Sequence, residues 1–315
     1  MKSTQFRVVG EEAHDLDQSD LHKLAMLLEK YAPHDGQFNL SRDGLHVFRA
    51  SKATEEVTYT LAQPGICIIA QGAKSVSLAK DSFEYNETNM VVYAAEVPIS
   101  VKVTKASVDE PYLCLVIPFN AAKLAELILK VFPGGIPKHS NTQAIYIGNS
   151  NPRVVQSAIR IMELFVNEED ADLLVPLVVD EIMIRLLRSS AGPAFAEIGI
   201  TDSNTCKISK AISWLKNNFA ESIKVDELSK MSGMSISAFH NHFKAVTNMT
   251  PLQFQKTLRL QEARNIMISK LLDAESASLE VGYASVSQFR REYARHFGCS
   301  PAKDIANVIK VAQAR

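Results

Sequence analysis

The chain has 315 residues, of which 46% are hydrophobic and 22% charged, with a net charge of −1, an ordinary globular composition that argues against extensive disorder. No apolar run approaches the roughly 20 residues that span a bilayer, and residues 1–15 lack the apolar segment of a signal peptide. The four cysteines lie far apart with no CxxC pair, so we expect a reduced cytoplasmic protein without a zinc or disulfide framework.

The first elements in chain order are short strands between residues 44 and 118. These segments are rich in β-branched and aromatic residues. Turn signals such as Pro64-Gly65 separate them at spacings of about 8–12 residues, which is typical of an all-β sandwich or barrel. We predict strands at 45–49, 57–60, 67–70, 75–78, 82–85, 90–93, 99–103 and 112–116.

A barrel of this kind could enclose an apolar pocket in which a few polar groups orient a ligand. A buried arginine or lysine there would favour an anionic or carbonyl-bearing molecule. For each candidate the alternative is a position on the outer face of its strand. The candidate ligand-binding residues are Arg49, Gln71, Lys74, Tyr85 and Tyr93.

The pattern of chemistry-bearing residues argues against an enzyme. A catalytic barrel with a metal centre needs clustered histidines and carboxylates, and the strands supply only His46. No GxSxG, Walker A or GxGxxG motif is present. We therefore expect no catalytic residue, no metal and no cofactor.

Three helices are predicted next, at about 120–132, 151–167 and 172–189. The last carries more apolar residues than one buried face needs, so it forms either core or a dimer seam. Residues 191–204, rich in small side chains, are predicted to form a linker between domains at 1–190 and 205–315. The candidate dimerisation residues are Leu173, Leu174, Leu177, Met183 and Leu186.

Charge divides the chain at this linker. Residues 1–204 carry 18 Lys/Arg against 26 Asp/Glu, whereas residues 205–315 carry 16 against 9. An acidic first part joined to a basic second part indicates a polyanionic partner for the second part only.

The basic part contains an internal repeat with an offset of 50 residues. Ser235 corresponds to Ser285, Phe239 to Phe289 and Pro251 to Pro301. In each copy a serine at an N-cap position precedes a helix with aromatic residues at i and i+4. A shorter amphipathic helix and a glycine-containing turn precede each of these, so each copy predicts a helix-turn-helix within a domain of about seven helices.

The second copy, GYASVSQFRREYARHFGCSP (282–301), resembles the signature of AraC-family transcription regulators, and SGMSISAFHNHFKAVTNMTP (232–251) resembles that family's other helix-turn-helix. The sequence departs from the family pattern at Asp304-Ile305, where an aromatic residue and arginine are usual. The stretch around Gln71-Gly72-Ala73-Lys74, Pro98 and Glu110-Pro111-Tyr112 resembles the N-terminal domain of one AraC-type subfamily. This resemblance implies an α+β chain: a cupin-like effector-sensing barrel with flanking, dimer-forming helices, followed by an all-α domain of two helix-turn-helix units.

In each repeat the face opposite the aromatic residues would enter the major groove of DNA. Arg290 or Arg291 could contact guanine, Asn241 adenine and Val286 a thymine methyl group, while Lys244 and Arg295 suit phosphates. The candidate DNA-binding residues are Ser237, His240, Asn241, Lys244, Val286, Ser287, Arg290, Arg291 and Arg295.

The expected function is a sequence-specific transcription regulator, and three readings differ in how it works. In the first, a small-molecule effector in the barrel controls a homodimer that binds double-stranded DNA, with RNA polymerase as a further partner. The second is a ligand-independent regulator controlled by its abundance or by a protein partner. The third, an enzyme fused to a DNA-binding tail, would need a reactive cysteine, and none of the four lies in a suitable sequence context.

Overall fold

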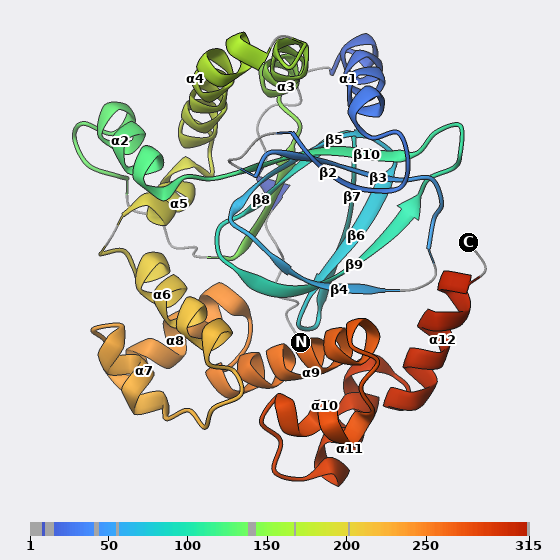
Figure 1. The fold of residues 1–315 in the computed structure, drawn as a ribbon. Coiled ribbons are helices and arrows are strands. Elements are labelled where there is room, and N and C mark those ends of the chain that lie inside the picture. Colours follow the sequence, from blue (N-terminus) through green and yellow to red (C-terminus); the bar gives the residue numbers. More distant parts are fainter. Residues whose placement is uncertain are drawn as a thin grey trace. The chain divides into compact units, whose positions relative to one another are not determined.

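The computed structural model describes residues 8–9, 16–40, 44–54, 57–137, 143–166, 168–200 and 202–313. The chain divides into two compact units, Met1–Lys207 and Ile208–Arg315 (Figure 1). Within the described residues, no helix has both the length and the apolar character to cross a membrane.

The first unit contains two β-sheets and flanking helices, so the α+β prediction is confirmed. All eight predicted strands are present. The described strands form two sheets and do not close into one hydrogen-bonded ring, and every pairing is antiparallel except that of β1 with β11. The larger sheet has the order β1 (Val8–Val9), β11 (Ile145–Asn149), β8 (Asn89–Tyr93), β5 (Gly65–Gln71), β10 (Tyr112–Pro118), β3 (His46–Ala50) and β2 (Gly36–Asn39). The smaller has the order β4 (Thr58–Ala62), β9 (Val97–Lys105), β6 (Ala73–Leu78) and β7 (Asp81–Asn86).

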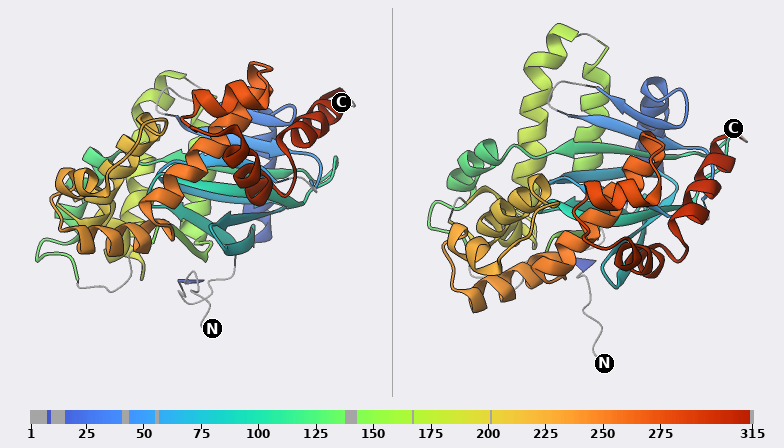
Figure 2. Two further views of the ribbon diagram at one scale, coloured as in Figure 1. Left: turned by 90° about the horizontal axis from the view of Figure 1, so that it is seen from below. Right: turned by 60° about the horizontal axis from the view of Figure 1, so that its bottom comes forward.

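Helices cover one face of the larger sheet, which leaves the other face toward the smaller sheet (Figures 1 and 2). The helices of this layer are α1 (Gln18–Tyr31), α2 (Ala121–Val131), α3 (Pro152–Leu164) and α4 (Glu168–Leu187). Because strand side chains alternate between faces, Leu113, Leu115 and Ile117 of β10 pack with the helices, whereas Tyr112 and Cys114 face the space between the sheets. The sequence analysis predicted α2, α3 and α4 but did not predict α1.

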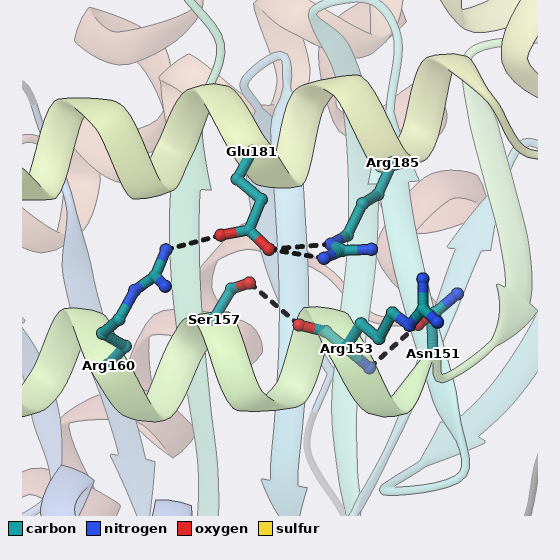
Figure 3. Close-up of polar contacts among 6 residues, drawn as sticks. All are labelled: Asn151, Arg153, Ser157, Arg160, Glu181 and Arg185. Atoms are coloured by element: carbon teal, nitrogen blue, oxygen red, sulfur yellow. Dashed lines mark hydrogen bonds and ion pairs between the residues drawn. The ribbon is translucent and has the colours of Figure 1, made fainter.

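Helices α3 and α4 pack side by side, and an ionic cluster joins them (Figure 3). Glu181 on α4 accepts hydrogen bonds from Arg160 on α3 and from Arg185 one turn further along α4. Burial raises the pKa of Glu181, but the two arginines outweigh this and the net shift is downward. Asn151 caps the start of α3 by accepting from the main-chain N–H of Arg153.

The segment expected as a linker, 191–204, is instead largely part of the first unit. Residues Gly192–Ala196 form α5 and Glu197–Gly199 form the short 3-10 helix η1. Phe195 is buried against Phe119, with ring centroids 4.8 Å apart. A Cβ on Gly192 would lie 1.8 Å from the carbonyl oxygen of Leu187, so the glycine reflects close packing and not a flexible joint.

In the second unit every described element is a helix, and the long helix α9 runs between two helix-turn-helix motifs (Figure 2). In the first, α7 (Val225–Met231) and α8 (Ile236–Thr247) follow α6 (Asn204–Asn217), which spans the boundary between the units. In the second, α10 (Ala274–Glu280) and α11 (Val286–Phe297) precede α12 (Pro301–Gln313). Helix α9 (Pro251–Ser269) contributes buried residues to both. The repeat and its seven helices agree with the sequence prediction.

Candidate DNA interface and ligand pocket

The two helices expected to read DNA, α8 and α11, begin and end in the same way. Ser235 accepts a hydrogen bond from the main-chain N–H of Ala238 at 3.3 Å, and Ser285 makes the equivalent bond at 3.3 Å. At their C-terminal ends Asn248 (φ 57°) and Gly298 (φ 78°) adopt the left-handed conformation. The caps predicted from the 50-residue offset are therefore confirmed.

Aromatic side chains hold α8 and α11 against their cores. Phe239 and Phe243 of α8 are fully buried, with centroids 5.5 Å apart, and Phe243 meets Phe254 of α9 edge-on. Phe289 and Tyr293 of α11 repeat this arrangement at 5.4 Å. Each helix thus has one fixed buried face, so its opposite face is the one available to DNA.

On α8, that opposite face carries the expected polar residues. Ser237, Asn241 and Lys244 are exposed, whereas His240 is half-buried beside the Phe239 ring. Among the described residues, no side-chain hydrogen bond or ion pair occupies Asn241 or Lys244. These donors are therefore free to contact bases or phosphates.

The corresponding face of α11 is more strongly basic. Ser287, Arg290, Arg291 and Arg295 are exposed, and Val286 is half-buried. Within the described part of the chain, the side chains of Arg291 and Arg295 form no hydrogen bond or ion pair. The pKa of Asp273 is lowered, mainly by the main-chain N–H of Ser276 and to a smaller extent by Arg290.

One further residue belongs to this surface and was missed by the sequence analysis. Ile236 is the first residue of α8 and 48% exposed, an unusual position for a β-branched apolar side chain. It corresponds to Val286 through the same 50-residue offset that identified the repeat. The offset could therefore have identified Ile236 as a second candidate for contact with a thymine methyl group.

The space between the two sheets contains three of the five predicted ligand-binding residues. The Lys74 ammonium lies 4.6 Å from the centroid of the Phe48 ring and 5.7 Å from that of Tyr112. No carboxylate of the described residues forms an ion pair with Lys74. Tyr85 and Tyr93 are both buried there, and burial raises the pKa of both phenols.

Two cysteines, Cys67 and Cys114, share this interior. Burial raises the pKa of the Cys67 and Cys114 thiols, so both stay protonated and weakly nucleophilic near neutral pH. Gln71 follows on the same strand as Cys67, and its amide donates to the Pro111 carbonyl at 2.9 Å. That hydrogen bond gives Gln71 a role in holding the end of β10.

The prediction that the remaining candidate, Arg49, lines the space between the sheets is wrong. Arg49 shares the face of β3 that carries Val47 and therefore points toward α1, away from the space between the sheets. Its Nη1 donates to the Ala32 carbonyl at 2.9 Å and lies 3.7 Å from a carboxylate oxygen of Glu29. A cation suits this place because the carbonyl groups at a helix C-terminus carry partial negative charge.

The candidate dimerisation residues divide into two groups. Leu173 and Leu177, one turn apart on α4, are 73% and 62% exposed, and Leu174 is also exposed. Met183 and Leu186 are buried in the core of the first unit, so their assignment to a dimer surface is corrected. Only the N-terminal half of α4 therefore offers an apolar surface to a partner.

Comparison with known proteins agrees with both parts of this description. Residues 41–194 match the family model described as AraC-type transcriptional regulator N-terminus, and residues 228–306 match a helix-turn-helix domain. The virulence regulon transcriptional activator VirF of Yersinia enterocolitica is 21% identical over 254 residues, which cover 80% of this chain and 91% of VirF. The transcriptional activator RhaS of Escherichia fergusonii is 28% identical over 101 residues, 32% of this chain and 36% of RhaS. The structure of ToxT from Vibrio cholerae is similar in fold, with a TM-score of 0.50 and 12% identity over 83% of this chain and 97% of ToxT.

Proposed function

This chain belongs to the AraC family of transcription regulators, and we propose that it reads its operators through two helix-turn-helix units per chain. The observation that carries the proposal is the repetition itself. Two helices with equivalent caps and equivalent aromatic anchors each expose a polar face, on which Asn241 and Arg291 make no side-chain hydrogen bond or ion pair with another described residue. Two such helices on one chain suit two successive major grooves, about 34 Å apart.

The roles of the exposed side chains follow from their donor groups. Arg290 and Arg291 match the paired acceptors of guanine, and Asn241 matches adenine. Ile236 and Val286 suit thymine methyl groups, whereas Lys244 and Arg295 suit phosphates, which fix the register without reading sequence. The names of VirF and RhaS describe activators, which favours activation as the mode of regulation.

The direct test is selection of duplexes by the full chain from a library with a randomised central region. We expect a motif of two boxes with centres about 10 base pairs apart, and a guanine-containing box for α11. Replacing Arg291 with alanine should relax the base preference in one box only. Recovery of a single short box would contradict the proposal that both helix-turn-helix motifs read bases.

For the first unit we propose that the space around Lys74 binds a small anionic effector. The Lys74 ammonium group lies near two aromatic rings and has no acidic partner among the described residues. A carboxylate or phosphate group of a ligand would supply the missing negative charge. The neighbouring phenols of Tyr85 and Tyr93 add hydrogen-bonding groups in an otherwise apolar interior.

A panel of small carboxylates and organic phosphates, scored by the thermal stability of the chain and by operator affinity, tests this effector site. We expect at least one member to change both quantities for the wild type and neither for Lys74→Met. Arg49→Met is the matched control, because Arg49 lies on the other face of its sheet. If no member changes either quantity, regulation by abundance or by a protein partner is favoured instead.

We also propose that the chain binds DNA as a homodimer through the N-terminal half of α4. Exposed leucines at i and i+4 form an apolar strip that water solvates poorly. Leu177 also lines a cavity of about 590 Å³, together with Phe119 and Pro176. A two-fold contact could place the strip of one chain against the cavity of its partner.

A further inference from the structure

The guanidinium group of Arg259, in the middle of α9, donates hydrogen bonds to four main-chain carbonyl groups. Its Nε lies 2.6 Å from the Phe219 oxygen, and its Nη2 lies 3.0 Å and 2.9 Å from those of Ala220 and Glu221. Its Nη1 donates to Gly282 at 2.9 Å. The first three carbonyl groups lie between α6 and α7, ahead of the first helix-turn-helix, whereas Gly282 lies in the turn of the second.

The same two segments touch each other directly. A Cβ on Gly282 would lie 2.0 Å from the Ala220 carbonyl oxygen, and Gly282 has a φ of +85° that favours glycine. Gln255, one turn before Arg259, donates to the Phe219 and Glu221 carbonyl groups at 2.9 Å and 2.6 Å. The loop at 219–221 therefore contacts both α9 and the turn between α10 and α11 of the second helix-turn-helix.

The contacts of Arg259 continue toward the second reading helix. Its guanidinium carbon lies 5.8 Å from the centroid of the Tyr283 ring, and the Tyr283 hydroxyl donates to Glu292 of α11 at 2.9 Å. Burial lowers the pKa of Arg259 from its ordinary value, which lies so far above neutrality that the group stays charged. Only arginine presents several donors in one rigid plane, so lysine could not satisfy four carbonyl groups at once.

We propose that Arg259 is a positioning residue that fixes the distance and rotation between α8 and α11, and thereby the spacing of the two boxes in the operator. The inference rests on the proposed function, because it assumes that both helices read DNA. Arg259 would contribute nothing to base preference within either box. One inserted base pair moves the second box by about 3.4 Å and rotates it by about 35° around the DNA axis, so a rigid joint cannot follow it.

The experiment measures the affinity of the full chain for the selected duplex and for versions with one base pair inserted between the boxes or removed. The affinity of the wild type should fall at least about tenfold on either change, because one of the two helix-turn-helix motifs loses its base contacts. Arg259→Lys should lose less than about threefold on the same change, while its base preference within each box stays that of wild type.

The matched control is Arg264→Lys, the same change five residues further along α9. The Arg264 side chain donates to Asp304 of α12 at 2.7 Å, so it supports the part of the domain that contains the second helix-turn-helix and makes no hydrogen bond to the loop at 219–221. This control should keep the tenfold dependence on spacing even if its overall affinity falls. An Arg259→Lys chain that unfolds cooperatively and keeps the wild-type dependence on spacing would overturn the proposal.

Should Arg259→Lys fail to fold, Gln255→Met decides the question, because it removes two ties to the same loop and leaves the arginine in place. It should reduce the spacing dependence in the same direction, and a full tenfold dependence would again overturn the proposal. Failure of the proposed function would look different, because the wild type would then select no two-box motif at all.

Discussion

Substitution of Arg290 by alanine should separate sequence reading from general attraction to DNA. Arg290 is exposed on α11, and its effect within the chain is a minor contribution to the lowered pKa of Asp273. The free energy of unfolding should therefore change by no more than about 0.5 kcal/mol. A bidentate contact to guanine contributes about 1–3 kcal/mol of discrimination, so affinity for the selected duplex should fall by roughly 5- to 150-fold.

Lys244→Ala is the matched control, since Lys244 is also exposed and its substitution removes the same charge. A phosphate contact carries no sequence information, so this change should weaken binding to selected and random duplexes alike. The slope of log affinity against log salt should become shallower by about 0.9. Titrations of both variants on a selected and a shuffled duplex, at several salt concentrations, give these quantities.

Equal losses on the selected and shuffled duplexes for Arg290→Ala would refute base reading by this side chain. A large loss of stability in the same variant would refute the claim that Arg290, on the outer face of α11, does not contribute to the stability of the fold. The two outcomes are separable, because Trp214, the single tryptophan, lies in α6 of the second unit and reports its unfolding.

Three further outcomes are expected. Phe239→Ala removes a fully buried ring and should cost the second unit about 3–5 kcal/mol, measured by urea unfolding followed through Trp214 fluorescence; a cost below about 1 kcal/mol would contradict the packing described. Tyr293→Phe removes a 2.6 Å hydrogen bond to Asp304 and should cost about 1.5–3 kcal/mol in the same assay, whereas no change would mean that Arg264 alone satisfies the carboxylate. Leu177→Glu should shift sedimentation of the full chain from dimer to monomer at micromolar concentration while thermal stability stays unchanged, and an unaffected dimer would exclude this face of α4.

The sequence predicted the second unit closely because its signals are local. Serine caps, left-handed C-terminal residues and aromatic pairs at i and i+4 each act within one helix, and they occur in both copies of the 50-residue repeat. The departure from the family pattern at Asp304 was visible, but its consequence was not. Asp304 on α12 accepts from Arg264 on α9 at 2.7 Å and from Tyr293 on α11 at 2.6 Å, so the three residues come from three different helices.

The first unit was predicted less completely because its main sheet is covered on both faces. Alternation of polar and apolar residues tells the faces of a strand apart only when one of them is solvated. For Arg49 the pattern could not distinguish the helix-covered face from the face that Lys74 approaches. Helix α1 did carry a signal, since Leu21, Leu24 and Leu28 follow helical spacing after the cap at Asp17.

Because apolar residues lie all around α4, the sequence could not predict which part of the helix is buried and which is exposed. Leu173 and Met183 are alike in sequence terms, yet one is 73% exposed and the other 2%. Which of them is covered depends on the packing of α2 and α3 beside the helix. Composition predicts that such a helix needs a partner but cannot say which turns remain for one outside the chain.

Hydroxyl-radical footprinting of the full chain on its selected duplex tests the central claim, that one chain reads DNA with both α8 and α11. The account predicts two protected segments for every chain bound, centred about one helical turn apart, with Arg291→Ala weakening one and Asn241→Ala the other. A single protected segment per chain, equally affected by both substitutions, would contradict it.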